Sequence, residues 1–193
     1  MARPRKHPLP SIAELRQHFT YNPETGEIRT REREGDDPYI LAFNRRYAGK
    51  AVGSVMNGGY RWIRVPGHGN HLGHRLAWAL HYGEWPGELD HRDTNKLNNR
   101  IENLRPATRS QNMRNVAGKG RTNFKGVTCR PVNRFNPWEA VIRINGQRVH
   151  LGSYPTPERA AEVYAEADRR YHGEYAFMVI GAITAAIMFG VAA

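Results

Sequence analysis

The sequence predicts an α+β chain in which two small modules follow one another, and three observations support this fold class. Between residues 11 and 83, short helical patterns alternate with runs of β-branched and aromatic residues that end at glycine or proline. Residues 124–175 then hold three short β patterns and one amphipathic helical pattern, which predict a three-stranded antiparallel sheet packed on one helix. The small, polar and basic residues 117–123 predict a linker between the two parts.

The first part, residues 1–70, is expected to begin with a helix and a strand. Ser11 is a suitable N-cap for a helix over residues 11–19, whose apolar residues fall on one face. A turn and a strand follow in YNPETGEIRT, residues 21–30, where proline and glycine mark the turn. Residues 33–48 are charged and irregular, which predicts a loop.

A hairpin and a helix are expected next. Residues 49–69 predict the hairpin, because two β runs flank Asn57-Gly58-Gly59. HLGHRLAWALHYGEWP, residues 71–86, predicts a helix that stops at Gly83. His74 lies near its start, and a packed contact is favoured there over a metal ligand, because no second ligand lies at helical spacing.

Within a module expected over residues 71–116, the block DHRDTNKLNNRIENLRPATRSQN carries the groups of a hydrolytic site. Asp90 offers an anionic oxygen and Asn112 a neutral amide oxygen, hard ligands that suit Mg²⁺ or Mn²⁺. His91, with an ordinary pKa near neutrality, is the natural general base, and Asn103 lies between these positions. Because neighbours on an extended strand point to opposite sides, Asp90 and His91 need a local twist to face one site.

The run from His74 through Asn115 resembles phage-type HNH homing endonucleases, whose ββα-metal fold holds one divalent ion. The residues that carry the resemblance are the HRLAWAL helix, the DHxDxNxxNNRxxNLR run and the closing N-x-x-N. The resemblance implies that Asp90 and Asn112 bind the metal, that His91 activates water and that Asn103 orients His91. The last position of the pattern is asparagine in this chain, where the family name would place histidine.

The same loop holds four further Asx residues: Asp93, Asn95, Asn98 and Asn99. Such residues in a long loop are expected to hydrogen-bond their own backbone rather than to bind the metal. Arg100 and Arg105 are left open between a contact with DNA and solvation of the loop.

In the second module, residues 124–175, the two faces of the predicted sheet differ in chemistry. Trp138, Ala140 and Ile142 share one face of their strand and should meet a helix that begins at the N-cap Thr156. The opposite face is basic, as a sheet that enters a DNA groove requires.

This segment resembles the DNA-binding domain of plant Apetala and ethylene-response factors, a domain that is also fused to phage HNH nucleases. KGVTCR, W-x-A-x-I-R, RVHLGSY and AAEVY carry the resemblance. It implies that five side chains line the DNA face: Lys125, Arg130, Arg143, Arg148 and His150. Because Thr128 and His150 replace residues that are often arginine and tryptophan in the plant proteins, the plant sequence preference is not carried over.

The composition favours a polyanionic partner, nucleic acid before membrane. The chain has 29 Lys and Arg against 18 Asp and Glu, a formal charge of +11. Cys129 is the only cysteine, which excludes an internal disulfide and a cysteine-based zinc knuckle and indicates a reducing compartment. The basic N-terminus lacks the apolar stretch of a secretory signal, so a cytoplasmic location is expected.

Residues 176–193 form an apolar tail without a charged side chain. As a helix the tail would span about 27 Å, near the lower limit for crossing a bilayer. Three interpretations stay open: a tail anchor, a helix that packs on the protein, and an extension that function does not need. Any membrane association would involve this tail alone.

Together these patterns predict a metal-dependent endonuclease of the homing type that hydrolyses double-stranded DNA, with His91 as general base. The rival interpretation is a sequence-specific DNA-binding regulator whose nuclease block is inactive. The sequence implies no protein partner.

Overall fold

The computed structural model describes residues 8–56, 58–115 and 124–176. The chain divides into two compact units, Met1–Ala107 and Thr108–Ala193, and each is described by itself. The expected linker and all but the first residue of the expected tail lie outside the described residues. Among the described residues, no helix is both long and apolar enough to span a bilayer.

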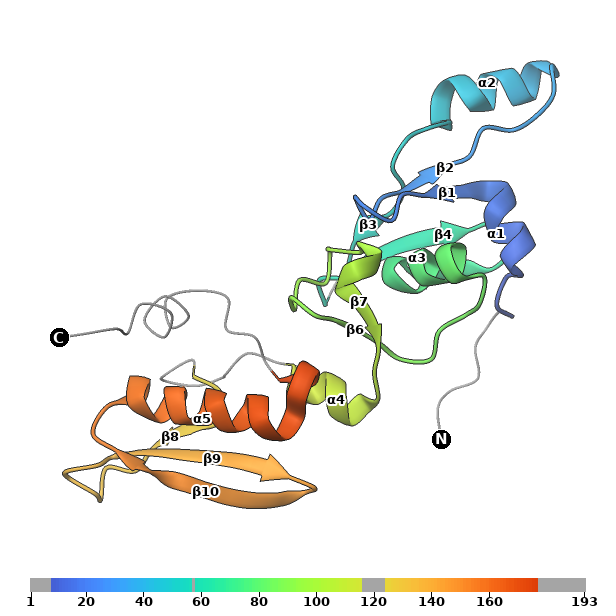
Figure 1. Cartoon of the computed structure of the whole chain (residues 1–193). Coiled ribbons are helices and arrows are strands. Elements are labelled where there is room, and N and C mark those ends of the chain that lie inside the picture. Colours follow the sequence, from blue (N-terminus) through green and yellow to red (C-terminus); the bar gives the residue numbers. More distant parts are fainter. Residues whose placement is uncertain (1–7, 57, 116–123, 177–193) are drawn as a thin grey trace. The chain divides into compact units, whose positions relative to one another are not determined.

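Unit 1 combines short helices with small antiparallel sheets (Figure 1). Its helices are α1 (Ile12–His18), α2 (Pro38–Tyr47), α3 (Gly73–Tyr82) and the 3₁₀ turn η1 (Ile101–Asn103). Its strands are β1 (Phe19–Tyr21), β2 (Ile28–Thr30), β3 (Ser54–Val55), β4 (Arg61–Val65), β5 (Gly69–Leu72), β6 (Leu89–His91) and β7 (Leu104–Pro106).

The core of unit 1 lies where α1 and α3 meet β1 and β4. Leu15 of α1, Ile63 of β4 and Leu76 of α3 are almost completely buried there. The expected helix caps are present: Ser11 accepts a hydrogen bond from the amide of Glu14, and Gly83 ends α3 in the left-handed conformation at φ 78°. The predicted hairpin is also confirmed as β3 and β4, and β5 adds a third strand.

Helix α2 corrects the expectation of a loop over residues 33–48. Asp37 caps this helix by accepting a hydrogen bond from the Tyr39 amide at 2.7 Å, and Pro38 occupies its first position. None of its side chains is buried. Ile40, Phe43 and Tyr47 recur at helical spacing, so the helical pattern is present in the sequence, and the charged residues that flank it explain the error.

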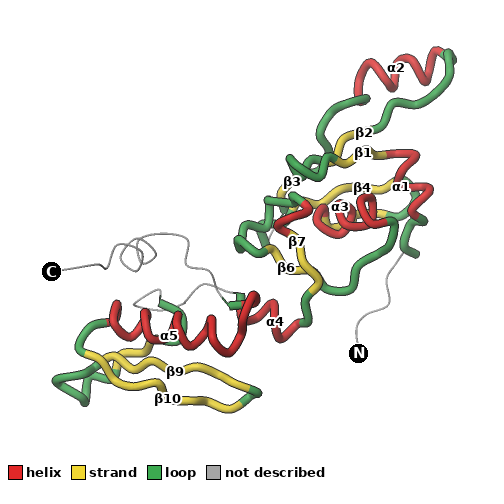
Figure 2. The backbone as a smooth tube through the Cα atoms, in the orientation of Figure 1, coloured by secondary structure: helices red, strands yellow, loops and turns green. Residues whose placement is uncertain are grey.

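Unit 2 is a three-stranded antiparallel sheet covered on one face by a helix, as Figures 1 and 2 show. Its elements are α4 (Arg109–Arg114), β8 (Val127–Cys129), β9 (Trp138–Ile144), β10 (Gln147–Tyr154), α5 (Pro157–His172) and the 3₁₀ turn η2 (Gly173–Tyr175). The strand order is β10-β9-β8, and the core holds Ala140 and Ile142 of β9 against Ala160 and Tyr164 of α5. Thr156 caps α5, as predicted.

Candidate active site around His91

The short hairpin of β6 and β7 positions the first two predicted site residues. Asp90 pairs with Arg105 and His91 pairs with Leu104 in this antiparallel register. All three residues of β6 are buried. In the part of the chain that the structure describes, β6 and β7 form a two-stranded sheet of their own, so buried polar side chains on it need partners from outside the sheet ladder.

Arg105 neutralises Asp90 inside unit 1. Its Nε and Nη2 atoms donate to Asp90 Oδ2 at 2.9 and 2.6 Å, and the two residues are only 4% and 8% exposed. Such a charge-assisted pair fixes the orientation of the carboxylate as well as its charge. Arg105 therefore has neither of the two roles that the sequence left open, because it is a buried partner of the predicted metal ligand.

His91 is held by an amide and two rings. Asn99 Oδ1 lies 3.2 Å from His91 Nε2, and the rings of His74 and Tyr60 lie 5.1 and 6.1 Å from the imidazole between centroids. An amide oxygen only accepts hydrogen bonds, so Nε2 of the neutral imidazole carries the hydrogen and Nδ1 has the basic lone pair. Burial lowers the pKa of His91, against smaller raising effects of Asn99, Asp93 and Asp90. The ring is therefore neutral at neutral pH and can accept a proton.

Asn99 owes its position to contacts that are distant in sequence. It is only 2% exposed, and the Tyr21 hydroxyl donates to its main-chain carbonyl at 2.8 Å. The turn before β2 approaches so closely that a Cβ on Gly26 would lie 2.7 Å from the Asn99 carbonyl carbon. A Cβ on Gly73 would likewise lie 3.2 Å from Asn99 Nδ2. The N-terminal part of unit 1 thus fixes the residue that contacts the imidazole.

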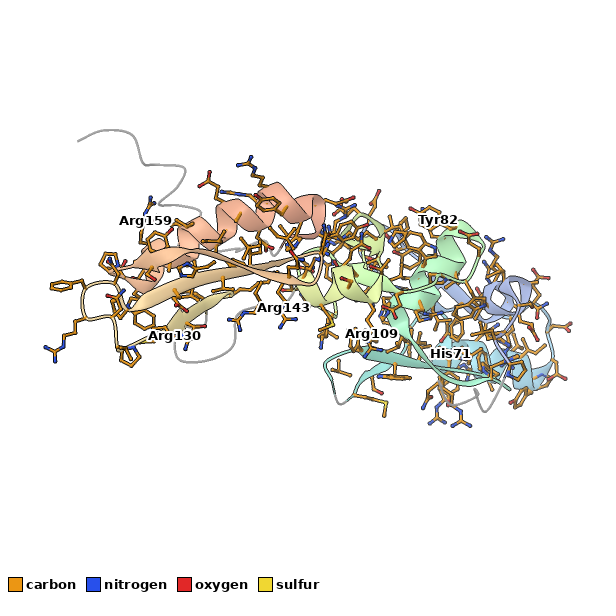
Figure 3. The ribbon with its side chains drawn as sticks, turned by 90° about the horizontal axis from the view of Figure 1, so that it is seen from below. His71, Tyr82, Arg109, Arg130, Arg143 and Arg159 are labelled. Carbon is orange, nitrogen blue, oxygen red and sulfur yellow. The ribbon has the colours of Figure 1, made fainter. Side chains whose placement is uncertain are left out.

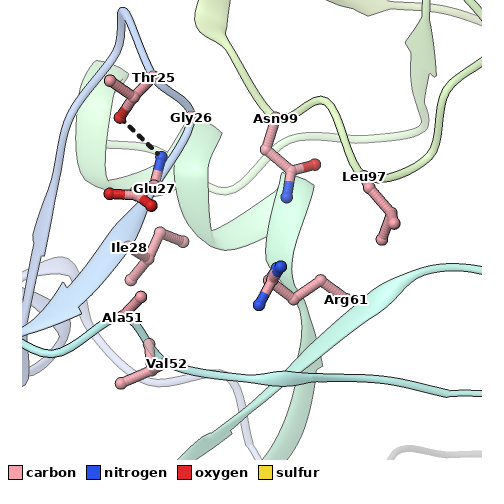
Figure 4. A pocket seen from close by; sticks show the side chains of 9 residues that line it. All are labelled: Thr25, Gly26, Glu27, Ile28, Ala51, Val52, Arg61, Leu97 and Asn99. Carbon is pink, nitrogen blue, oxygen red and sulfur yellow. Dashed lines mark hydrogen bonds between the residues drawn. The ribbon is translucent and has the colours of Figure 1, made fainter.

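Asn99 also lines a pocket of about 180 Å³ between the turn at Gly26 and strand β4 (Figure 4). Arg61 and Asn99 point toward each other across this pocket in Figure 4. The Arg61 guanidinium donates a hydrogen bond to the Gly53 carbonyl at 3.2 Å. The amide of Asn99 therefore lies between the imidazole and a cationic pocket.

Asn103, which was expected to orient His91, contacts the intervening loop instead. Its Nδ2 donates to Asp93 Oδ1 and to the Asn98 carbonyl, at 2.9 and 2.8 Å. Its Oδ1 accepts from the Asp93 amide at 3.0 Å. In the structure, Asn103 acts on the fold of the loop, and the amide next to the imidazole is that of Asn99.

The other Asx residues of the loop largely follow the expectation of backbone bonding. Asp93 accepts from the amide of Asn95, Asn95 from the amide of Leu97, and Asn98 from the amide of Arg100. These bonds shape the turn, and Asn99 is the exception, since its side chain reaches His91.

His74 is a packed residue, as the sequence favoured. It is buried, and burial together with the neighbouring His91 and Arg75 lowers its pKa to about 3. Its ring lies 5.3 Å from Tyr60 and 5.1 Å from His91, so its contact with the site is by packing. A neutral ring here adds no charge beside His91.

The predicted cation ligands form a small set. Among the described residues, no group of three or more His, Cys, Asp or Glu side chains could hold a metal ion. One carboxylate and one amide oxygen would leave most positions to water and phosphate, which suits Mg²⁺ or Mn²⁺ better than zinc. Asp90 belongs to unit 1, and Asn112 lies on α4 of unit 2, so its role stays a prediction.

The uncovered face of the sheet in unit 2 carries four of the five predicted DNA contacts. Arg143 and Arg148 are cross-strand partners, and His150 pairs with Val141 on the same face. Arg130 reaches this face too, since its Nε donates to Glu139 of β9 at 3.1 Å. Figure 3 shows Arg130 and Arg143 on the side of the sheet opposite Arg159 of α5.

Lys125 is the exception and corrects the expectation. Its ammonium group donates to Asp168 of α5 at 3.1 Å and lies 5.6 Å from the centre of the Tyr164 ring. Gly126 makes this possible: a Cβ there would lie 2.0 Å from a Tyr164 ring atom, so only glycine lets the chain pass so close to α5. Lys125 precedes strand β8, which begins at Val127, so the alternation of faces along a strand does not place its side chain.

The contacts of Asn99 and Arg105 were not predicted from the sequence. Asn99 and Arg105 both belong to the NNRxxNLR run, but hydrogen-bond capacity alone does not distinguish Asn99 from Asn103 or Asn98. The distinguishing contacts come from Tyr21 and Gly26, more than seventy residues away.

Part of the chain is similar to known proteins. A family model described as HNH endonuclease matches residues 71–114, the stretch from β5 to α4 that includes Asp90, His91, Asn103 and Asn112. An uncharacterised HNH endonuclease of Acanthamoeba polyphaga mimivirus, L560, is 37% identical over 106 residues, which make up 53% of this chain and 54% of the viral protein. The chain therefore spans about half the length of this relative. No solved structure matches the chain. Residues 71–114 of the chain are thus similar to HNH endonucleases.

Proposed function

We propose that the chain is a metal-dependent DNA endonuclease of the homing type that uses His91 as its general base. The observation that carries the proposal is the environment of His91 inside the matched domain. The imidazole is buried and neutral, and Asn99 Oδ1 at 3.2 Å leaves Nδ1 as its proton acceptor. A base of this kind is what attack of water on a phosphodiester requires.

The proposed division of work follows from the chemistry of each side chain. His91 Nδ1 takes a proton from the attacking water, while Asn99 holds the ring in one tautomer. Asp90 and, by the family pattern, Asn112 would hold a divalent ion, with Mg²⁺ or Mn²⁺ the candidates. Such an ion, when bound, stabilises negative charge on the phosphate and on the leaving oxygen. Arg105 keeps the Asp90 carboxylate in a fixed orientation through its bonds at 2.6 and 2.9 Å.

Unit 2 would locate the substrate. Its uncovered face presents Arg130, Arg143, Arg148 and His150. Side chains of this kind neutralise phosphates, and the excess of +11 charges over the whole chain favours the same partner. We propose that this face binds double-stranded DNA and that the unit resembles the ethylene-response-factor domain in this respect.

A plasmid-nicking assay with Mg²⁺ tests the proposal. The wild-type chain should convert supercoiled plasmid that carries its target to nicked or linear DNA, and excess EDTA should stop this reaction. His91→Ala should abolish cleavage while DNA binding persists. His81→Ala, at an exposed histidine of α3, is the matched control and should cleave normally. Equal cleavage by wild type and His91→Ala would reject the base, and binding without any cleavage by wild type would favour the rival, a DNA-binding regulator.

A further inference from the structure

The connection between β8 and β9 in unit 2 presents two apolar side chains to solvent. Val132 is 95% exposed and Phe135 is 87% exposed, more than any other large hydrophobic residue among those that the structure describes. The connection RPVNRFNP, residues 130–137, is also longer than a tight hairpin needs. Exposure of the aromatic ring of Phe135 to water is unfavourable in free energy. Its position on the loop therefore suggests that a binding partner covers it.

The loop is shaped by its own hydrogen bonds. The Asn133 amide donates to the Arg130 carbonyl at 3.1 Å, and the Asn136 amide donates to Asn133 Oδ1 at 3.0 Å. The Arg130 amide donates to the Pro137 carbonyl and closes the base of the loop. A projection held in this way loses little conformational freedom on binding.

The charge around Phe135 selects the kind of partner. Arg130 and Arg134 lie within the loop, which contains no acidic residue. Arg130 also reaches the sheet face of Arg143 and Arg148 through Glu139, so the loop is continuous with the basic face. An aromatic ring next to arginines fits a polyanion whose interior is apolar and stacked, which describes duplex DNA.

We propose that the loop at residues 130–137 enters a groove of the DNA and that Phe135 inserts as a wedge at a base step, while Arg134 contacts a phosphate. This inference rests on the proposed DNA binding by unit 2. A side chain that partly unstacks a base step bends the DNA duplex, and the bend allows the protein to contact more of the DNA. Two measurements follow. Loss of the Phe135 ring should reduce the unstacking of the base step, and loss of the Arg134 charge should reduce the salt dependence of binding.

Binding is measured with the full chain carrying His91→Ala, on a fluorescein-labelled duplex selected by that chain from a randomised library. Copies of the duplex carry 2-aminopurine at successive positions, because its fluorescence rises when a step unstacks. The chain should raise this fluorescence at one step. Phe135→Ala should abolish the rise and weaken binding on the order of 10-fold, with an unchanged salt slope. Arg134→Gln should keep the rise and reduce the slope of log K against log salt by about 0.9.

Tyr171→Ala is the matched control, since it removes an exposed ring from α5, on the other side of the sheet, and should leave both signals unchanged. Phe135→Leu should retain part of the fluorescence rise, because an apolar wedge remains. Equal affinity and equal fluorescence for Phe135→Ala and its parent would refute insertion of Phe135 into DNA. That result would favour a protein as the partner of the loop. A parent chain that binds no duplex at low salt would instead refute the proposed function of unit 2.

Discussion

Replacing Gly26 with alanine tests whether the N-terminal turn positions the imidazole of His91, the proposed general base. Gly26 has φ 76°, and a Cβ there would lie 2.6 Å from the Arg100 amide nitrogen and 2.7 Å from the Asn99 carbonyl carbon. The left-handed conformation costs a non-glycine residue about 1 kcal/mol, and overpacking against backbone costs about 1–3 kcal/mol more. Relief of the clash must move Asn99, which contacts His91 at 3.2 Å.

Gly67→Ala is a matched control for this substitution. Gly67 has φ 74°, and nothing lies within 4 Å of the position of its Cβ. It should therefore cost only the conformational term of about 1 kcal/mol. The free energy of unfolding should be lower for Gly26→Ala than for Gly67→Ala by about 1–3 kcal/mol.

Urea unfolding followed by tryptophan fluorescence measures this difference, because three of the four tryptophans belong to unit 1: Trp62, Trp78 and Trp85. Cleavage is assayed on the folded variants. Gly26→Ala should also cleave more slowly, on the order of 10²-fold, as expected when a base is displaced by about 1 Å, while Gly67→Ala cleaves normally. Equal midpoints and equal rates for the two variants would refute the reasoning that links the turn to His91.

Three further predictions concern charge. Asn99→Asp keeps an acceptor oxygen but adds a negative charge beside the imidazole, so it should raise the pKa of His91. The acid limb of the profile of cleavage rate against pH should therefore move to higher pH. An unmoved limb would contradict the contact between Asn99 and His91. The pKa of His74 is about 3 when folded and about 6.5 when unfolded, so the stability of unit 1 should fall as pH drops from about 6.5 to 3, by at most about 1.4 kcal/mol per pH unit. His74→Phe should flatten that part of a stability curve measured by urea midpoints at successive pH values. Lys125→Met leaves the buried Asp168 without its ammonium partner and should destabilise unit 2 by about 3 kcal/mol in thermal unfolding, with no change in the salt slope of DNA binding; the opposite pattern would restore Lys125 to the DNA face.

The sequence predicted the parts of the fold that depend on neighbours in the chain. Ser11 and Thr156 cap their helices and Gly83 ends α3, because capping and left-handed glycine are local requirements. Helix α2 was missed because charged residues flank its apolar positions. The β patterns of unit 2 were strong enough to predict its sheet and the basic character of one face.

The candidate site was predicted in its residue types but not in its contacts. His91 was predicted from its chemistry and the family resemblance, and its role as general base stays a prediction. Its neighbours were not, because Asn99 and Asn103 carry the same amide in the same loop. Only the contacts of Tyr21, Gly26 and Gly73 with Asn99 distinguish them, and such contacts depend on tertiary packing.

The pairing of Asp90 with Arg105 has a consequence for the folding of the protein in the absence of a divalent ion. A buried carboxylate that waited for a cation would make folding depend on the ion supply, as in proteins whose metal is needed to fold. Arg105 provides the counter-charge from within the hairpin, through bonds of 2.6 and 2.9 Å to one carboxylate oxygen. The hairpin can therefore reach its final form in surroundings poor in divalent ions. On the proposed mechanism, folding of the hairpin and activation of the nuclease by a divalent ion are separate events, so the folded chain cuts no DNA until the ion binds.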